Sequence, residues 1–293
     1  MSEPRTIELQ ANGLRFAALE MGQGPLVLCL HGFPDTALTF KHQMPALAAA
    51  GYRVVAPYMR GYAPTEPAPD GNYQTASLGR DVLGLIDALQ PGAKAILFGH
   101  DWGALASYAA AVLGPDKIDR IVTAAVPYGQ RLATAFVESY EQQKRSWYMF
   151  FFQGPLAETA VAMNDFRFIR RLWKDWSPTW DFTEADIAPV IETLGKPGVL
   201  EAALGYYRCL LNPALQDPAL MSDQMRVGLE PIGVPAMYMH GADDHCMGLE
   251  MTEGMEASFT AGLTKVVLDG AGHFVQLEKP QQVTERILAF LRE

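Results

Sequence analysis

The chain has 293 residues, of which 49% are apolar, and a formal net charge of −10 at pH 7. This length is sufficient to bury one large hydrophobic core. An acidic chain repels phosphate backbones and anionic lipids, so nucleic acids and membrane surfaces are poor candidate partners. The composition is compatible with a homo-oligomer but does not require one.

The N-terminal segment Met-Ser-Glu-Pro-Arg-Thr lacks the basic and then apolar order of a secretory signal. No apolar run approaches the roughly 18 residues that a membrane-spanning helix needs. Cys29, Cys209 and Cys246 are far apart in the sequence and odd in number. We therefore expect reduced cysteines that pack in the interior of a cytoplasmic protein.

The first predicted elements form a β-hairpin and then an alternation of strands and helices. Residues 5–10 and 14–20 flank Asn12-Gly13, a dipeptide that favours a two-residue turn between antiparallel strands. The next expected strands are 26–30, 53–57, 95–98 and 121–126, and the expected helices lie near 37–50, 75–90 and 103–113. This alternation predicts an α/β fold with a mostly parallel, doubly wound sheet.

From residue 128 to about 228 the pattern changes to helical periodicity with many aromatic side chains and no convincing strand. The alternation then resumes with a strand at 235–239, a helix near 248–258, a strand at 264–268 and a final helix. We therefore predict an α/β core domain of residues 1–127 and 229–293. It is interrupted by a helical cap (lid) domain at 128–228, which we expect to cover a binding site.

The most informative local pattern is an apolar strand that runs directly into Gly-His-Asp-Trp-Gly at 99–103. Glycines on both sides of Asp101 allow the sharp strand-to-helix turn of a nucleophile elbow. Such a turn lifts its central side chain above the carboxyl edge of the sheet, where α/β folds bind ligands. The following helix N-terminus favours negative charge at this place. We predict that Asp101 is a nucleophile, with an ordinary helix N-cap as the alternative.

His273 follows the last expected strand in the glycine-rich segment Asp-Gly-Ala-Gly-His. The order nucleophile, acid, histidine along the chain makes His273 the expected general base. The acid is expected in the segment His-Gly-Ala-Asp-Asp-His at 240–245. A Gly-x-x-Asp spacing favours Asp244, and Asp243 is the alternative.

A further loop, His-Gly-Phe-Pro at 31–34, follows the apolar strand at 26–30. Its glycine and proline fix a tight turn whose backbone N–H groups can face the nucleophile. The expected oxyanion-hole donors are the N–H group of Phe33 and that of Trp102, the residue after the nucleophile.

Together these segments resemble the epoxide hydrolase branch of the α/β-hydrolase family. The matching pieces are His-Gly-Phe-Pro at 31–34, Arg-Gly-Tyr at 60–62, Gly-His-Asp-Trp-Gly at 99–103, Gly-x-x-Asp at 241–244 and Gly-His-Phe at 272–274. They extend over nearly the whole chain. The resemblance implies the α/β-hydrolase fold with a helical cap. It also implies a reaction in which Asp101 forms a covalent ester that His273, oriented by Asp244, helps to hydrolyse.

In that branch two cap tyrosines bind the epoxide oxygen. The resemblance assigns this role to Tyr148, which begins an aromatic stretch that leads to Phe-Gln, and to Tyr207 of a Tyr-Arg pair. The residues alone do not select these two from Tyr128, Tyr140 and Tyr206.

Haloalkane dehalogenases are near relatives of this branch and also use Asp, His and a second acid. They need N–H donors for a leaving halide. Trp102 together with Trp173 or Trp176 of the cap keeps this function open, although Phe33 offers no side-chain donor. A catalytically silent binding protein of the same fold is disfavoured because the nucleophile, acid and histidine are all present.

The reaction that the resemblance implies opens an epoxide to a vicinal diol and needs no cofactor. His240, Asp244 and His245 are conceivable metal ligands, but their spacing matches no recognised ligand pattern, so we expect no metal. The apolar cap predicts a small hydrophobic epoxide as the substrate.

Overall fold

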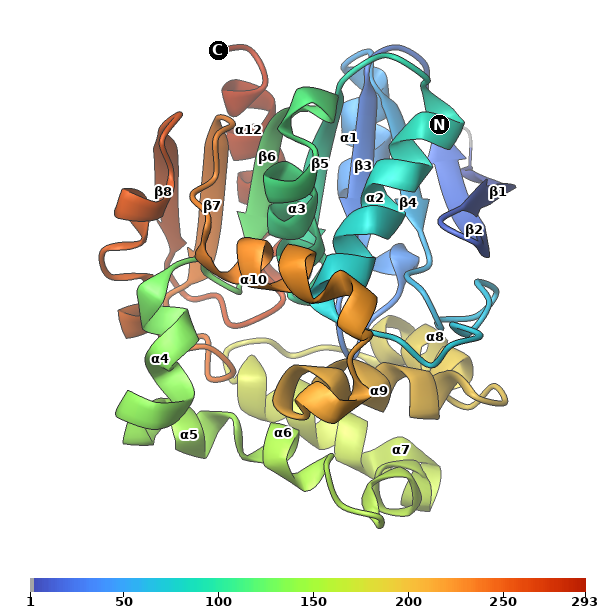
Figure 1. The fold of residues 1–293 in the computed structure, drawn as a ribbon, viewed down its shortest axis with the longest axis vertical. Helices are drawn as coiled ribbons and strands as arrows, with labels where there is room; N and C mark the ends of the chain where they lie inside the picture. The colour runs from blue at the N-terminus through green and yellow to red at the C-terminus, as the bar shows by residue number, and fades with distance from the viewer. Residues whose placement is uncertain (1–2) are drawn as a thin grey trace.

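The computed structural model describes residues 3–293, and its centre is one eight-stranded sheet (Figure 1). The strands are β1 (Arg5–Ala11), β2 (Leu14–Met21), β3 (Leu26–Leu30), β4 (Arg53–Pro57), β5 (Ala95–His100), β6 (Ile118–Ala124), β7 (Ala236–Gly241) and β8 (Leu263–Leu268). Their order across the sheet is β1-β2-β4-β3-β5-β6-β7-β8. The β1–β2 and β2–β4 pairs are antiparallel, and the other neighbours are parallel.

Helices cover both faces of this sheet. They are α1 (Gln43–Ala49), α2 (Thr75–Leu89), α3 (Trp102–Leu113), α10 (Met221–Leu229), α11 (Val275–Glu278) and α12 (Pro280–Phe290). In Figure 1, α2 and α3 lie in front of the sheet, and α1 and α12 lie behind it. Leu28 and Leu97 belong to the core on one face, whereas Val27 and Ile96 belong to the core on the other. Successive strand residues point to opposite faces, so continuous apolar runs fill both cores, and the predicted α/β class is confirmed.

The predicted hairpin turn joins β1 to β2. Asn12 and Gly13 have positive φ angles of 46° and 77°, and Ala11 pairs with Leu14 across the turn. A two-residue turn of this geometry needs both central residues in the left-handed region, which asparagine and glycine adopt most readily. Here the local sequence determines both the turn and the register of the two strands.

A helical insertion leaves the core after β6 and returns before β7. Its helices are α4 (Gln130–Glu138), α5 (Tyr140–Arg145), α6 (Trp147–Phe151), α7 (Ala157–Trp176), α8 (Glu184–Leu194) and α9 (Val199–Leu211). They lie together beyond one end of the sheet (Figure 1), so the predicted helical cap is present. The helix α10, which belongs to the range predicted as cap, packs against α2 and α3. The domain bounds at 128 and 228 stay a prediction.

Two segments expected as single helices are broken. The segment near 37–50 contains a 3-10 helix, Ala37–Phe40, followed by α1. The segment near 248–258 contains two 3-10 helices, Leu249–Thr252 and Met255–Ser258. Between them lies Gly254 with a φ angle of 73°, a left-handed backbone that ends a helix.

Among the described residues, no helix is both long enough and apolar enough to cross a membrane.

Candidate active site

Asp101 lies at a sharp turn between β5 and α3. Its backbone angles are φ 53° and ψ −117°, a conformation that costs a non-glycine residue on the order of 1–3 kcal/mol. A Cβ atom on Gly99 would overlap the carbonyl oxygen of Gly103, and one on Gly103 would overlap the carbonyl oxygen of Leu30. The two glycines are therefore needed for the close packing of α3 against β3 and β5 that holds Asp101 at the edge of the sheet.

Two loops bring a histidine and an acid to this turn. The Nδ1 atom of His273 lies 3.0 Å from Oδ2 of Asp244, and its Nε2 atom lies 3.7 Å from Oδ2 of Asp101. The backbone N–H groups of Cys246 and Met247 donate to the other oxygen of Asp244, at 2.7 and 2.9 Å. Asp244 is therefore fixed on both oxygens and oriented toward the imidazole.

The adjacent acid, Asp243, has a different environment. Its side chain is partly exposed, whereas that of Asp244 is buried and hydrogen-bonded to His273. The structure thus brings Asp244 to the histidine and leaves Asp243 outside the group.

Burial and mutual interaction shift the pKa values of Asp101, Asp244 and His273. Burial raises the pKa of Asp101, and the positive charge of His273 and the amides of Phe33 and Trp102 oppose this shift without cancelling it. For Asp244, burial also raises the pKa, but His273 outweighs it and the pKa is lowered. Burial lowers the pKa of His273, while Cys246 and Asp244 outweigh it and raise the pKa well above its usual value. The geometry therefore favours an imidazolium flanked by carboxylates.

The predicted oxyanion donors surround the same carboxylate. The N–H group of Phe33 donates to Oδ1 of Asp101 at 2.7 Å, and the amide of Trp102 lowers the pKa of Asp101. A Cβ atom on Gly32 would overlap the Oδ1 atom of Asp101. Only glycine at position 32 allows the loop of Phe33 to approach the carboxylate this closely.

The hydroxyl groups of the five cap tyrosines have different surroundings. The Tyr128 hydroxyl donates to the carbonyl oxygen of Glu230 at 2.6 Å, and the Tyr206 hydroxyl donates to that of Arg60 at 2.8 Å. The Tyr140 side chain is on the surface. These three hydroxyl groups are therefore engaged or exposed.

Tyr148 of α6 and Tyr207 of α9 differ from the other three. Their rings are 5.6 Å apart, and both are buried. The Tyr207 hydroxyl has no hydrogen-bond partner among the described residues, and the Tyr148 hydroxyl lies 3.4 Å from the Sγ atom of Cys246. Burial raises the pKa of both phenols well above 10, so both keep their protons at neutral pH and remain donors.

A cavity of about 350 Å³ connects these groups. Asp101, Trp102, Tyr148, Tyr207 and Cys246 line it, and most of the other side chains in its wall are apolar. Its volume is in the range of small-ligand sites. The arrangement places one carboxylate and two phenol hydroxyls in a shared apolar space beneath the cap.

Sequence patterns did not point to two contacts that hold the histidine loop. The N–H group of His273 donates to Oγ of Ser177, which in turn donates to Oε1 of Glu278. The N–H group of Gly272 donates to the other oxygen of Glu278 at 2.8 Å. Ser177 follows the last helical turn of α7, so the cap itself supports the position of His273. No local motif marks such a long-range contact.

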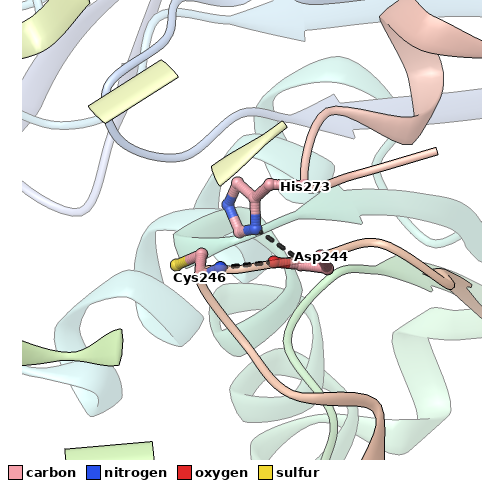
Figure 2. Close-up of side chains that lie close together, drawn as sticks. All are labelled: Asp244, Cys246 and His273. Atoms are coloured by element: carbon pink, nitrogen blue, oxygen red, sulfur yellow. Dashed lines mark hydrogen bonds and ion pairs between the residues drawn. The ribbon is translucent and has the colours of Figure 1, made fainter. Parts of the chain in front are cut away.

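Cys246 is a further member of the site that the sequence predicted only as a packing residue. Figure 2 shows it beside Asp244 and His273, and it lines the cavity.

The structure does not bring together His240, Asp244 and His245, the metal ligands that were conceivable from the sequence. His240 contacts the Tyr238 hydroxyl and a backbone carbonyl through its two ring nitrogens, and His245 is exposed.

Comparison with known proteins identifies the class. Residues 25–280 match the family described as alpha/beta hydrolase fold. The chain therefore belongs to the α/β-hydrolase family. An epoxide hydrolase from Caballeronia sordidicola is 31% identical to it over 97% of this chain and 93% of that protein. Epoxide hydrolase A from Mycobacterium tuberculosis is 29% identical over 99% of this chain and 98% of that protein.

The fold comparison agrees. The crystal structure of epoxide hydrolase A from Mycobacterium thermoresistibile gives a TM-score of 0.83 at 30% identity, covering 99% of this chain and 98% of that chain. The predicted resemblance to epoxide hydrolases is confirmed over the full length of the chain, cap included.

Proposed function

We propose that the protein opens an epoxide to a vicinal diol through an alkyl ester on Asp101. One observation carries the proposal: two buried phenol hydroxyls, neither bound to a backbone acceptor, share an apolar cavity with the Asp101 carboxylate. A ring-opening attack needs a preformed anion on one side of the substrate and proton donors at the departing oxygen.

In the first step, Oδ2 of Asp101 attacks an epoxide carbon from the side opposite its C–O bond. That bond breaks, and Tyr148 and Tyr207 donate hydrogen bonds to the developing alkoxide. One of the two phenols transfers its proton to the alkoxide and regains a proton from solvent. Oδ1 stays with the N–H group of Phe33. A carboxylate is ionised near neutral pH and needs no base for this attack.

In the second step, water attacks the carbonyl carbon of the ester. Esterification removes the negative charge of Asp101, so His273 loses an anionic neighbour 3.7 Å from its Nε2 atom. Its pKa then falls, the imidazolium releases a proton to solvent, and the neutral imidazole can accept a proton from the attacking water. Collapse of the tetrahedral intermediate breaks the bond to the substrate oxygen, which takes a proton from the imidazolium and leaves as the diol, and the Asp101 carboxyl group returns its proton to His273. Phe33 and Trp102 N–H groups hold the tetrahedral oxyanion, an interaction worth about 3 kcal/mol for each donor. No metal or cofactor has a part in either step.

The apolar wall of the cavity favours a small hydrophobic epoxide as the substrate.

The main alternative function is that of a haloalkane dehalogenase, for which Trp173 was one conceivable donor to the leaving halide. Its Nε1 atom instead donates to the carbonyl oxygen of Pro34 at 2.9 Å. A panel of epoxides and haloalkanes, with diol and halide both measured, separates the two activities. We expect diol from the epoxides and no halide release.

The two cap tyrosines give a specific test. Replacing either Tyr148 or Tyr207 by Phe removes one donor to the departing oxygen and should lower kcat about 10- to 100-fold. The double variant should lose on the order of 10³-fold. The matched control is Tyr206→Phe, a change at the residue before Tyr207 on α9. The Tyr206 hydroxyl donates to the carbonyl oxygen of Arg60. It should cost about 1 kcal/mol of stability and little kcat. Equal effects of all three changes on kcat would refute the assignment.

A further inference from the structure

The side chains of Asp244, Cys246 and His273 converge in a way that the proposed reaction does not explain. The carboxylate oxygen, the thiol sulfur and the imidazole nitrogen all lie within 4.8 Å of one another. Figure 2 shows the three side chains close together, and all three residues are buried. Asp244 and Cys246 come from the loop after β7, and His273 comes from the loop after β8. The two steps above use the carboxylate and the imidazole but assign nothing to the thiol.

The thiol is free for another role. Its sulfur lies 3.4 Å from the Tyr148 hydroxyl and also interacts with the His273 imidazole, and Cys246 lines the cavity. Cys246 forms no disulfide. The cavity therefore reaches the residue whose sulfur lies close to the Asp244 carboxylate and the His273 imidazole.

A thiolate, an imidazole and a carboxylate are the three ligand types that zinc binds in proteins. In a tetrahedral site with bonds of about 2.0 Å, two ligand atoms are about 3.3 Å apart. The Nδ1 atom of His273 and Oδ2 of Asp244 are 3.0 Å apart, so a cation can replace the proton between them with little movement.

We propose that Asp244, Cys246 and His273 form an inhibitory binding site for a thiophilic divalent cation such as Zn²⁺ or Cd²⁺. On binding, the thiol proton and the Nδ1 proton leave to solvent. The cation bonds to sulfur, nitrogen and oxygen with no change in oxidation state. The bound cation breaks the pairing of Asp244 with the imidazole, so His273 no longer activates water.

Cadmium binding tests the site without any substrate, and its outcome is therefore independent of the proposed function. Titration of the metal-free protein with Cd²⁺ should produce the ultraviolet charge-transfer band of a cadmium–thiolate bond, saturating at one cation per chain. Cys246→Ser and Cys246→Ala should remove the band. Asp244→Asn and His273→Gln should weaken binding by at least about 100-fold, because each removes a direct ligand.

Cys209→Ser is the matched control, since Cys209 is also free and buried but lies on α9 with its sulfur near the Leu215 carbonyl. This variant should bind Cd²⁺ as the unmodified protein does. Circular dichroism confirms that each variant is folded. The proposal is overturned if the folded Cys246→Ser protein keeps the band, or if the band depends on Cys209.

Inhibition of the enzyme by the bound cation rests on the proposed function, and it is measured separately, as the rate of diol formation. Cd²⁺ should abolish diol formation at the concentration that saturates the absorption band, and a chelator should restore it. The Cys246→Ser enzyme, compared with its own rate without metal, should tolerate at least about 100-fold more Cd²⁺. Saturation of the band with an unchanged rate of diol formation would overturn inhibition and leave the binding result standing.

Discussion

The His273→Gln variant should form the Asp101 ester and fail to hydrolyse it. Steady-state turnover is expected to fall about 10²- to 10⁴-fold, because a carboxamide cannot accept a proton from water. The first step should persist, since Asp101 needs no base and keeps the N–H group of Phe33. After incubation with a reactive epoxide, mass spectrometry should find the peptide that contains Asp101 heavier by the mass of that epoxide.

Two controls make this result specific. Adding Asp101→Ala to His273→Gln should remove the adduct, because the ester then has no carboxylate on which to form. His245→Gln should leave turnover near its original rate, because this histidine is exposed and outside the site. A turnover-deficient His273→Gln protein that shows no adduct with several reactive epoxides would contradict the assigned order of steps.

The Asp244→Asn variant should lose turnover on the order of 10³- to 10⁴-fold through a change in the tautomer of His273. The N–H groups of Cys246 and Met247 hold one oxygen of the carboxylate, so the oxygen of an asparagine amide takes this position. Its NH₂ group then faces Nδ1 of His273 and donates to it. The ring carries its proton on Nε2 instead, which can no longer accept one from water.

The neighbouring acid supplies the matched control. Asp243→Asn makes the same chemical change one residue away, at a partly exposed side chain, and should alter turnover less than about twofold. Rates for both variants should be measured with far-ultraviolet circular dichroism as a check on folding. A loss at Asp243 equal to that at Asp244 would mean that the acid had been assigned to the wrong residue.

Local sequence predicted those features whose physical cause is local. The Asn12-Gly13 turn follows from the φ angles that these two residues accept. The turn at Asp101 follows from the glycines beside it, which let α3 approach β3 and β5 without a clash. The order of nucleophile, acid and histidine follows from the chain order of the strands that end at one edge of the sheet. These features placed Asp101, Asp244 and His273 correctly near one another.

Features that depend on distant contacts could not be predicted in this way. Tyr206 and Tyr207 are adjacent in the sequence, yet only the first has its hydroxyl bound to the backbone, at Arg60. Cys246 lies two residues after the acid Asp244 and carries no motif of its own, and only the return of the loop after β8 places it beside His273. Ser177 carries no motif at all. Its role in holding the histidine loop arises from the docking of the cap.

The central claim is that the carboxylate of Asp101 bonds to the substrate, and a single turnover in heavy-oxygen water tests it most directly. With enzyme in excess over epoxide, the diol should contain no heavy oxygen, because its new oxygen atom comes from Asp101. The label should appear in the peptide that carries Asp101. Heavy oxygen in the diol, with an unlabelled Asp101, would mean that water attacks the epoxide directly and that no ester forms.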